Sequence, residues 1–260
     1  MKKTLIAATA LSALSISAFA ADLSSRTKSP SAPIFTWTGS YAGVNAGLAS
    51  MHSKSDDLGS SLESSWREDG SSTTTNAAGF LVGGQLGYNV QVNSLVYGVE
   101  TDLAFTTASK TSKYSAVDAQ DANYENSNNR LVALGTLRGR LGVAFDRTLV
   151  FATGGLAYGK VENNWSANWA HFDGDTYGVS ANTNSWRFGW TAGAGVEQAL
   201  SGGWSAKVEG LYYDLGKAKS SGVDYCTSVI TCEDPHVSWN RSTKNSGYLV
   251  RVGLNYKLGN

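Results

Sequence analysis

The chain has 260 residues, with 21 lysines and arginines balanced against 21 aspartates and glutamates, and only 16% of its residues are charged. Balanced charge excludes a nucleic-acid-binding protein that works by neutralising phosphates, and 11% aromatic residues with so few charges exclude an intrinsically disordered chain. Two cysteines are too few for a disulfide-rich scaffold or a cysteine-rich metal domain.

The N-terminal residues have the pattern of a secretory signal peptide. Lys2 and Lys3 precede an apolar run over residues 5–16, and small residues follow at the positions that signal peptidase reads. We therefore predict a cleaved signal peptide at residues 1–20, because the run is too short and too diluted with Ser and Thr for a membrane anchor. The polar, proline-containing residues 21–36 are predicted to form a periplasmic tether.

Beyond the tether, apolar and polar residues alternate with a period of two, which is the pattern of β-strands with two different faces. Eight segments show this alternation: 38–48, 80–90, 95–105, 131–145, 149–160, 186–200, 204–215 and 247–258. Within 131–145, the apolar face includes Leu131 and Ala133, and the polar face carries Arg138. At ~3.3 Å per residue and a tilt of ~40°, such segments cross the ~25 Å apolar band of an outer membrane.

The connections between these segments alternate in length. Short turns are expected at 91–94, 146–148 and 201–203, and long connections near 50–78, 106–129, 161–185 and 216–246. Long loops on one side and short turns on the other are typical of a transmembrane β-barrel. We therefore predict an all-β, eight-stranded, antiparallel up-and-down barrel over residues 37–258 in the Gram-negative outer membrane. Its four long loops would be extracellular and both termini periplasmic.

A secreted soluble sandwich or a lipocalin-like cup is the alternative, and its inward faces would be apolar. Aromatic residues favour the membrane barrel, because they cluster near the strand ends as in the girdles that meet the two lipid interfaces. The girdles are predicted to contain Trp37, Tyr88, Tyr97, Phe105, Trp190, Trp204, Tyr248 and Tyr256, with Phe151 beside them near a short turn. Outer-membrane lipids and lipopolysaccharide are the partners expected for this face, and no nucleic acid is expected.

The opposite face of the predicted strands carries four acids and four bases. They are Glu100, Asp102, Glu197 and Glu209, and Arg138, Arg140, Lys207 and Arg251. An eight-stranded barrel is just wide enough for side chains to fill its interior, and unpaired charges there would be costly, so we expect these groups to pair. The hypothesis is a polar plug that fixes strand register and blocks diffusion. The alternative is a gated, charge-lined pore, which would make the protein a small porin with a narrow channel.

A resemblance to a known family covers nearly the whole chain after the signal peptide. Residues 135–147, GTLRGRLGVAFDR, and 152–159, ATGGLAYG, resemble the signature of the small outer-membrane immunogenic proteins, which are porin-family barrels of alphaproteobacteria. Residues 37–43 resemble the first strand of that family, and 189–197 and 204–209 resemble its sixth and seventh strands. The resemblance implies an eight-stranded OmpA-type barrel without the peptidoglycan-binding domain, and a surface-exposed antigen.

Two features depart from that family. Barrels of that family usually end on an aromatic residue, which the barrel-assembly machinery recognises, so the resemblance implies this machinery as a partner. The present sequence ends at Asn260, with Tyr256 and Leu258 in the matching phase. The residue after the glutamate of the sixth strand, often aromatic in the family, is Gln198 here. The first departure bears on how the chain is inserted into the membrane.

Cys226 and Cys232 lie close together in the last long connection. An exported protein meets an oxidising compartment, so we expect these two residues to form a disulfide. A metal site that adds His236 is the weaker alternative, because two cysteines and one loop histidine do not complete a zinc site. No metal or other cofactor is therefore expected.

Few other residues in the sequence suggest a ligand-binding or catalytic site. All three histidines, His52, His171 and His236, fall in the long connections, where solvated side chains are expected; haem ligation beside Trp165 and Trp169 is the alternative. No serine, histidine and acid constellation can be assigned on strands, so neither a catalytic residue nor an enzyme such as a lipid-modifying barrel is expected. The prediction is an outer-membrane barrel with structural and surface-exposed roles, as antigen, in envelope integrity or in adhesion, whose loops contact host or cell-surface molecules.

Overall fold

The computed structural model describes residues 35–60, 72–117, 121–171, 176–227 and 238–258, and all regular elements within these ranges are β-strands. The strands are β1 (Gly39–Ser60), β2 (Ser72–Val92), β3 (Leu95–Thr106), β4 (Ser109–Val117), β5 (Asp121–Phe145), β6 (Thr148–His171), β7 (Thr176–Ala199), β8 (Trp204–Thr227) and β9 (Ser238–Leu258). Within the same ranges there is no helix long and apolar enough to cross a membrane.

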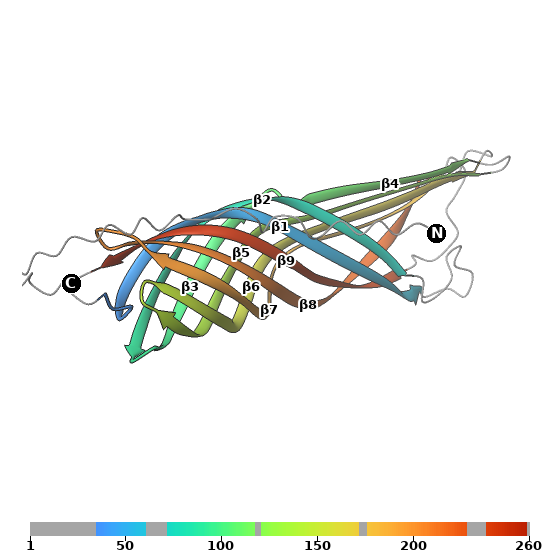
Figure 1. Cartoon of the computed structure of the whole chain (residues 1–260). Coiled ribbons are helices and arrows are strands. Elements are labelled where there is room, and N and C mark those ends of the chain that lie inside the picture. Colours follow the sequence, from blue (N-terminus) through green and yellow to red (C-terminus); the bar gives the residue numbers. More distant parts are fainter. Residues whose placement is uncertain (1–34, 61–71, 118–120, 172–175, 228–237, 259–260) are drawn as a thin grey trace, which may run out of the picture. The chain divides into compact units, whose positions relative to one another are not determined.

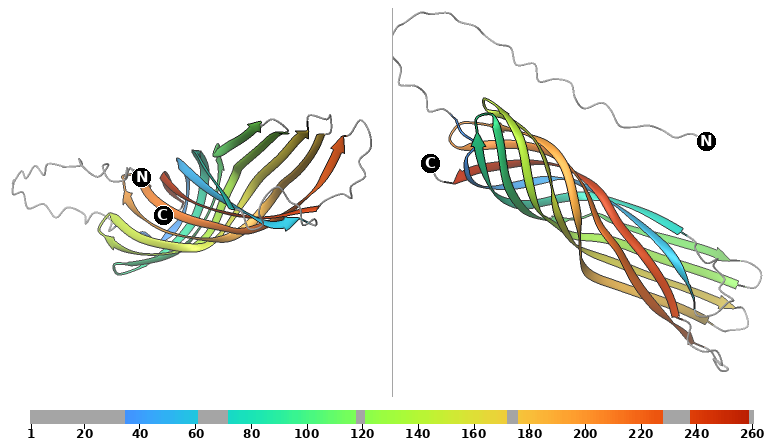
Figure 2. Two further views of the ribbon diagram at one scale, coloured as in Figure 1. Left: turned by 90° about the vertical axis from the view of Figure 1, so that its right-hand side faces the viewer. Right: turned by 90° about the horizontal axis from the view of Figure 1, so that it is seen from below.

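The strands form a closed ring (Figures 1 and 2). Hydrogen-bonded neighbours follow the order β1-β9-β8-β7-β6-β5-β3-β2, and β2 pairs again with β1. Strand β4 continues the arm of β3 beyond a break at Thr107 and Ala108, where Leu131 N–H donates to the Ala108 carbonyl at 3.0 Å. The predicted all-β antiparallel architecture is confirmed, and the additional strand arises because this one arm is interrupted.

The short connections lie where the sequence predicts them. Asn93 and Asp146 adopt φ angles of 56° and 53° in two of these turns, and Gly202 and Gly203 adopt 67° and 82° in the third. Asn, Asp and Gly are the residues that tolerate this left-handed conformation. The local chemistry of the chain therefore explains the tight end of the barrel.

The prediction of four long loops is wrong for most of their length. Strands β1, β6 and β8 continue to Ser60, His171 and Thr227. Their hairpin partners β2, β7 and β9 begin at Ser72, Thr176 and Ser238, well inside the predicted loops. Ser, Thr and Asn occupy both faces of these extensions, so the alternation of apolar and polar residues that reveals a strand is lost there. Backbone pairing between antiparallel neighbours does not require that alternation, and the hairpins continue as paired arms.

The outer face of the ring is apolar. Phe80, Phe188 and Val44 are 72%, 76% and 63% exposed, and the other exposed large apolar side chains alternate with buried ones along the same strands. A soluble cup would bury such side chains, whereas an outward apolar band is typical of a barrel in lipid.

One strand departs from the predicted phase. The register of β5 on β6 shifts between Leu131 and Ala133, and both residues are buried although the sequence predicts them on the outer face. A bulge adds one residue to a strand and reverses the faces of the residues beyond it. Leu131 consequently packs inside the barrel rather than toward lipid.

Candidate functional site: the barrel interior

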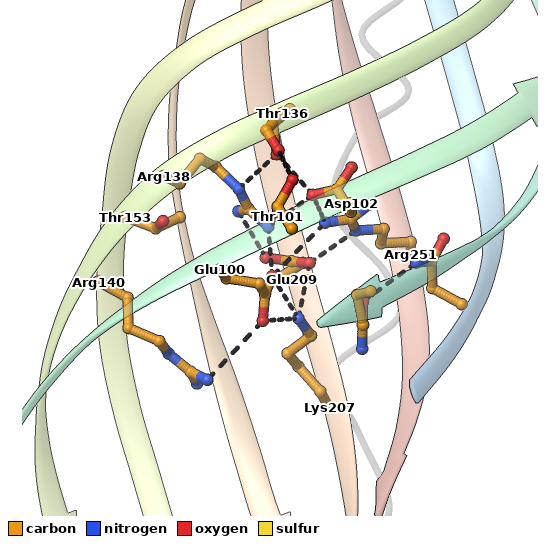
Figure 3. A network of polar contacts seen from close by, with 12 residues as sticks. Glu100, Thr101, Asp102, Thr136, Arg138, Arg140, Thr153, Lys207, Glu209 and Arg251 are labelled. Carbon is orange, nitrogen blue, oxygen red and sulfur yellow. Dashed lines mark hydrogen bonds and ion pairs between the residues drawn. The ribbon is translucent and has the colours of Figure 1, made fainter. Parts of the chain in front are cut away.

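Seven of the eight charged residues predicted on the inner face lie together inside the barrel (Figure 3), and the eighth, Glu197, forms an ion pair with Arg140. They come from strands β3, β5, β7, β8 and β9, and each is at most 4% exposed. We call this set the charge network: Glu100, Asp102, Glu197, Glu209, Arg138, Arg140, Lys207 and Arg251.

Strand register brings opposite charges face to face. Glu100 on β3 is the direct partner of Arg138 on β5, and Glu209 on β8 is the direct partner of Arg251 on β9. Directly opposite residues in an antiparallel pair have Cβ atoms roughly 4.5–5.5 Å apart, close enough for opposite charges to interact. Part of the network is therefore set by the pairing of neighbouring strands.

Arg138 joins carboxylates from different walls of the barrel. Its guanidinium contacts Glu100 on β3, lies 3.1 Å from Asp102 on the same strand, and reaches 3.0 Å across the lumen to Glu209 on β8. Its Nε donates a hydrogen bond of 2.8 Å to Thr136 Oγ1, and Thr136 in turn donates to Asp102. The planar guanidinium, with five N–H donors, suits this multiple role.

Two further cations contact the carboxylates at the centre of the network. Lys207 Nζ lies 2.8 Å from Glu100 and 3.1 Å from Glu209. Arg251 lies 2.6 Å from Glu209 through Nε and 2.8 Å from Asp102 through Nη2. Glu100, Asp102 and Glu209 therefore each contact at least two cations, so the charges are shared rather than arranged as isolated pairs.

Arg140 and Glu197 form the part of the network nearest the short turns. Arg140 Nη2 lies 2.7 Å from Glu197, which also accepts hydrogen bonds from Ser205 and, at 2.8 Å, from Asn255. The Arg140 guanidinium stands 4.0 Å from the centre of the Phe151 ring. This arginine links the polar interior to the aromatic residues at the end of the barrel.

Buried apolar residues line the lumen on both sides of the charge network. On strands β3, β8 and β9, the next inward residue toward the long hairpins is apolar: Ala104, Leu211 and Leu249. On β5, Thr136 follows Arg138 on the inner face, and the apolar Leu134 comes next. These apolar residues belong to a buried cluster that also holds Met51, Tyr213 and Leu215. Toward the short turns lies a second buried cluster of Trp37, Val96, Ala144, Leu149, Phe151 and Ala199.

Several polar partners of the network are not predicted from the sequence. Tyr41 donates a 2.6 Å hydrogen bond to Glu100 and accepts one from Arg140, while Asn45 donates to Gln85 at 3.0 Å. Their signal in the sequence is their position on the glycine-bearing face of the strands, but an uncharged side chain on that face does not by itself predict a partner of the network. Gly87 leaves room for this arrangement, because a Cβ there would lie 2.3 Å from the Tyr41 ring.

The predicted girdle aromatics face outward, except Trp37 and the adjoining Phe151. Tyr88, Tyr97, Phe105, Trp190, Trp204, Tyr248 and Tyr256 are all more than 40% exposed. Trp37, in contrast, is 6% exposed and its backbone N–H donates to Gln91 at 2.8 Å. The prediction is wrong for Trp37 because it shares the phase of the inward residues of β1, such as Tyr41, and it packs under the end of the barrel. Phe151 is likewise buried at 3% exposure rather than part of the girdle.

The other candidate residues are not brought together by the part of the chain that the structure describes. His52 is exposed beside Tyr248, with ring centres 6.2 Å apart. The side chains of His171, His236, Cys226 and Cys232 lie outside the described residues, so the disulfide and the haem alternative stay predictions. Among the described side chains, no group of three or more His, Cys, Asp or Glu residues could hold a metal ion.

Comparison with known proteins identifies the family. Residues 6–233 match the model of the outer membrane protein beta-barrel domain. The chain is 36% identical to the 31 kDa outer-membrane immunogenic protein of Brucella melitensis biotype 1, over 98% of this chain and 100% of that protein. It is 26% identical to the 25 kDa outer-membrane immunogenic protein of Brucella abortus biovar 1, with 99% of each covered. Among solved structures, the outer membrane protein OprG from Pseudomonas aeruginosa matches at 12% identity and a TM-score of 0.41, over 85% of this chain and 97% of that one. The chain thus belongs to the outer-membrane β-barrel family of which the Brucella immunogenic proteins are members.

Proposed function

We propose that this protein is an outer-membrane barrel with a closed lumen, which serves the envelope structurally and presents a surface outside the cell. The observation that carries the proposal is the interior itself. A charge network of four acids and four bases, with no net charge, lies buried in the lumen between two apolar clusters.

A closed lumen follows from what a solute would have to displace. Each charged group of the network is buried and paired, and removing one partner from a buried pair typically costs about 3–5 kcal/mol. A hydrated ion that passed the network would also have to pass the apolar clusters on either side. The side chains of these clusters offer no polar group that could replace the water molecules of its hydration shell. A cavity near the short turns, lined in part by Trp37, Tyr41 and Glu197, has a volume of about 30 Å³, which is room for about two water molecules.

The long hairpins support a surface role. The paired arms of β5, β6 and β7 continue past the apolar band by roughly ten residues, which is about 30 Å of strand. Their outer faces carry Ser, Asn and Thr with occasional aromatic residues such as Tyr124, which is 51% exposed. In outer-membrane barrels the longer connections are extracellular, so we assign these arms to the cell surface and both termini to the periplasm.

The names of the relatives agree with this proposal. The Brucella relatives are named as outer-membrane immunogenic proteins, and an immunogenic protein is one that the host encounters. We therefore extend to this chain a role as a surface-exposed antigen, with envelope integrity and adhesion as the activities to be tested.

Planar-bilayer recordings test the closed lumen directly. Purified protein is expected to give no stable openings, while an open porin reconstituted in parallel gives its usual conductance. Large, reproducible openings from this protein would establish the small-porin alternative and refute the closed lumen.

A deletion strain tests the surface role. Loss of envelope integrity or of adhesion, with unchanged uptake of small solutes, is the expected outcome. A loss of solute uptake alone would contradict the proposal, and restoration by the intact gene is the control.

A further inference from the structure

Three lysines lie side by side on the outer face of the barrel. Register pairs Lys54 on β1 with Lys244 on β9, and the same Lys244 with Lys217 on β8. We call these three residues the lysine row. Their side chains point outward, because the adjacent residues Ser53, Asn245 and Ala218 are buried at 1%, 1% and 3% exposure.

The row lies just beyond a chain of aromatic side chains. Tyr212 contacts Trp190 and Tyr248 with ring centres 5.2 and 5.0 Å apart, and His52 continues the chain beside Tyr248. These residues lie on the same strands as the row, with Trp190 on neighbouring β7. Lys244 precedes Tyr248 by four positions on β9, which is ~13 Å along the strand and ~10 Å along the membrane normal at a ~40° tilt.

That level is where lipid headgroups meet the barrel. Aromatic girdles mark the boundary between the apolar core and the headgroups, and the polar region extends about 5–8 Å beyond it on each side. The long, flexible side chains of the lysine row can bring their ammonium groups into this layer from ~10 Å above Tyr248. The lysine row is on the side of the long hairpins, which is the outer leaflet in barrels of this type. Three ammonium groups therefore project at the height of the outer-leaflet headgroups.

Among the described side chains, the three lysines of the row face two neighbouring carboxylates. Lys244 lies 2.8 Å from Asp214, and Lys54 lies 3.5 Å from Asp56. The hydrogen bond that Lys244 donates to Asp214 raises the pKa of this lysine, so it stays charged at neutral pH. Lys217 adds a third positive charge directly opposite Lys244, and like charges opposite one another destabilise a sheet.

A bound anion removes that repulsion. We propose that the lysine row binds the phosphate groups of a phosphorylated lipid headgroup in the outer leaflet. Lysine presents a compact charge with three donors, which suits phosphate oxygens approached from several directions. The aromatic side chains below the row would contact the acyl chains of the same molecule, so we commit to a lipid rather than to free phosphate. The proposal does not depend on a closed lumen.

Binding of diphosphoryl lipid A to the purified protein in dodecyl maltoside micelles, counted by native mass spectrometry, tests the proposal. The variant Lys217→Gln with Lys244→Gln is expected to bind about 10- to 30-fold more weakly than wild type, from the usual contribution of each lysine at an anionic surface. Lys110→Gln with Lys113→Gln is the matched control. It removes the same charge from exposed positions of β4, where register sets each lysine opposite an asparagine, and its binding should be unchanged.

Two further arms identify the ligand. Dephosphorylated lipid A should bind wild type about as weakly as diphosphoryl lipid A binds the double variant, and millimolar inorganic phosphate should not compete. Equal losses in the test and control variants would show general charge attraction and overturn the site. Equal binding of both lipids, or full competition by inorganic phosphate, would overturn the phosphorylated-lipid assignment. Heat-modified gel migration checks folding, and Lys217→Gln alone serves if the double variant does not fold.

Discussion

Replacing Arg138 with methionine is the sharpest test of the charge network. Methionine keeps most of the side-chain length and removes the charge and all five donors. The substitution deletes the contacts with Glu100, Asp102 and Glu209, and the hydrogen bond to Thr136. Four carboxylates then face three cations in an interior where each of them is at most 4% exposed.

The expected cost follows from what the carboxylates retain. Removing one member of a buried ion pair typically costs 3–5 kcal/mol, because the other charge is left without compensation. Here Lys207 remains 2.8 Å from Glu100. Arg251 remains 2.8 Å from Asp102 and 2.6 Å from Glu209. Since no carboxylate loses its last cation, we expect the lower end of the range, a loss of about 3 kcal/mol in the free energy of unfolding.

Urea unfolding in lipid vesicles, followed by tryptophan fluorescence, measures this loss. Arg130→Met is a matched control on the same strand, because the Arg130 side chain is 51% exposed and lies 4.0 Å from Glu162. An exposed pair of this kind contributes less than about 1 kcal/mol. The difference between the two variants isolates the effect of burial.

Equal stability of the two variants would refute the reasoning, because it would mean that the lumen solvates its charges. A second variant sharpens the result. Combining Arg138→Met with Glu100→Gln restores neutrality inside the barrel, and we expect it to recover part of the lost stability. No recovery would show that lost packing, rather than unbalanced charge, causes the destabilisation.

Three other predictions follow from the packing of the interior and from the sequence. Gly87→Ala should lower stability by about 1–3 kcal/mol, measured by the same unfolding assay, because the new Cβ would lie 2.3 Å from the Tyr41 ring. Trp37→Ala should cost about 3–5 kcal/mol as a buried truncation, and a cost no larger than for an exposed girdle tryptophan would contradict its burial. Mass spectrometry without reductant should detect a peptide that links Cys226 to Cys232, and two free thiols would contradict the disulfide.

The period-two alternation predicts the inner face of the barrel well, because it depends only on the backbone geometry of each strand. It identifies all eight members of the charge network. The alternation fails as a guide where a bulge breaks its phase, or where polar residues occupy both faces of a strand. The bulge at Leu131 reverses the face of that residue. Trp37 lies just before the first alternating segment, and its phase is that of the inward Tyr41 rather than that of the girdle.

The partners within the network could not be predicted from the sequence. Glu100 and Arg138 are close because neighbouring strands pair them, and a hairpin register can be expected from short turns. Arg138 also reaches Glu209, however, and their strands β5 and β8 are not neighbours in the ring. Such contacts depend on closure of the whole barrel, its diameter and the length of each side chain.

The closed, neutral interior that we propose and the asymmetric outer face would give the two sides of the barrel wall different roles. Inside, shared charges join strands on opposite walls, so the pairing that fixes the ring is reinforced through the lumen and long hairpins can extend from a rigid base. Outside, the apolar band ends in an aromatic chain, and the lysine row lies directly beyond it. The chain is neutral as a whole, yet its charges are compensated inside and left in excess along the lysine row. We therefore expect ligands to bind on the outer surface of the barrel, at the headgroup level and along the hairpins, rather than to pass through a pore.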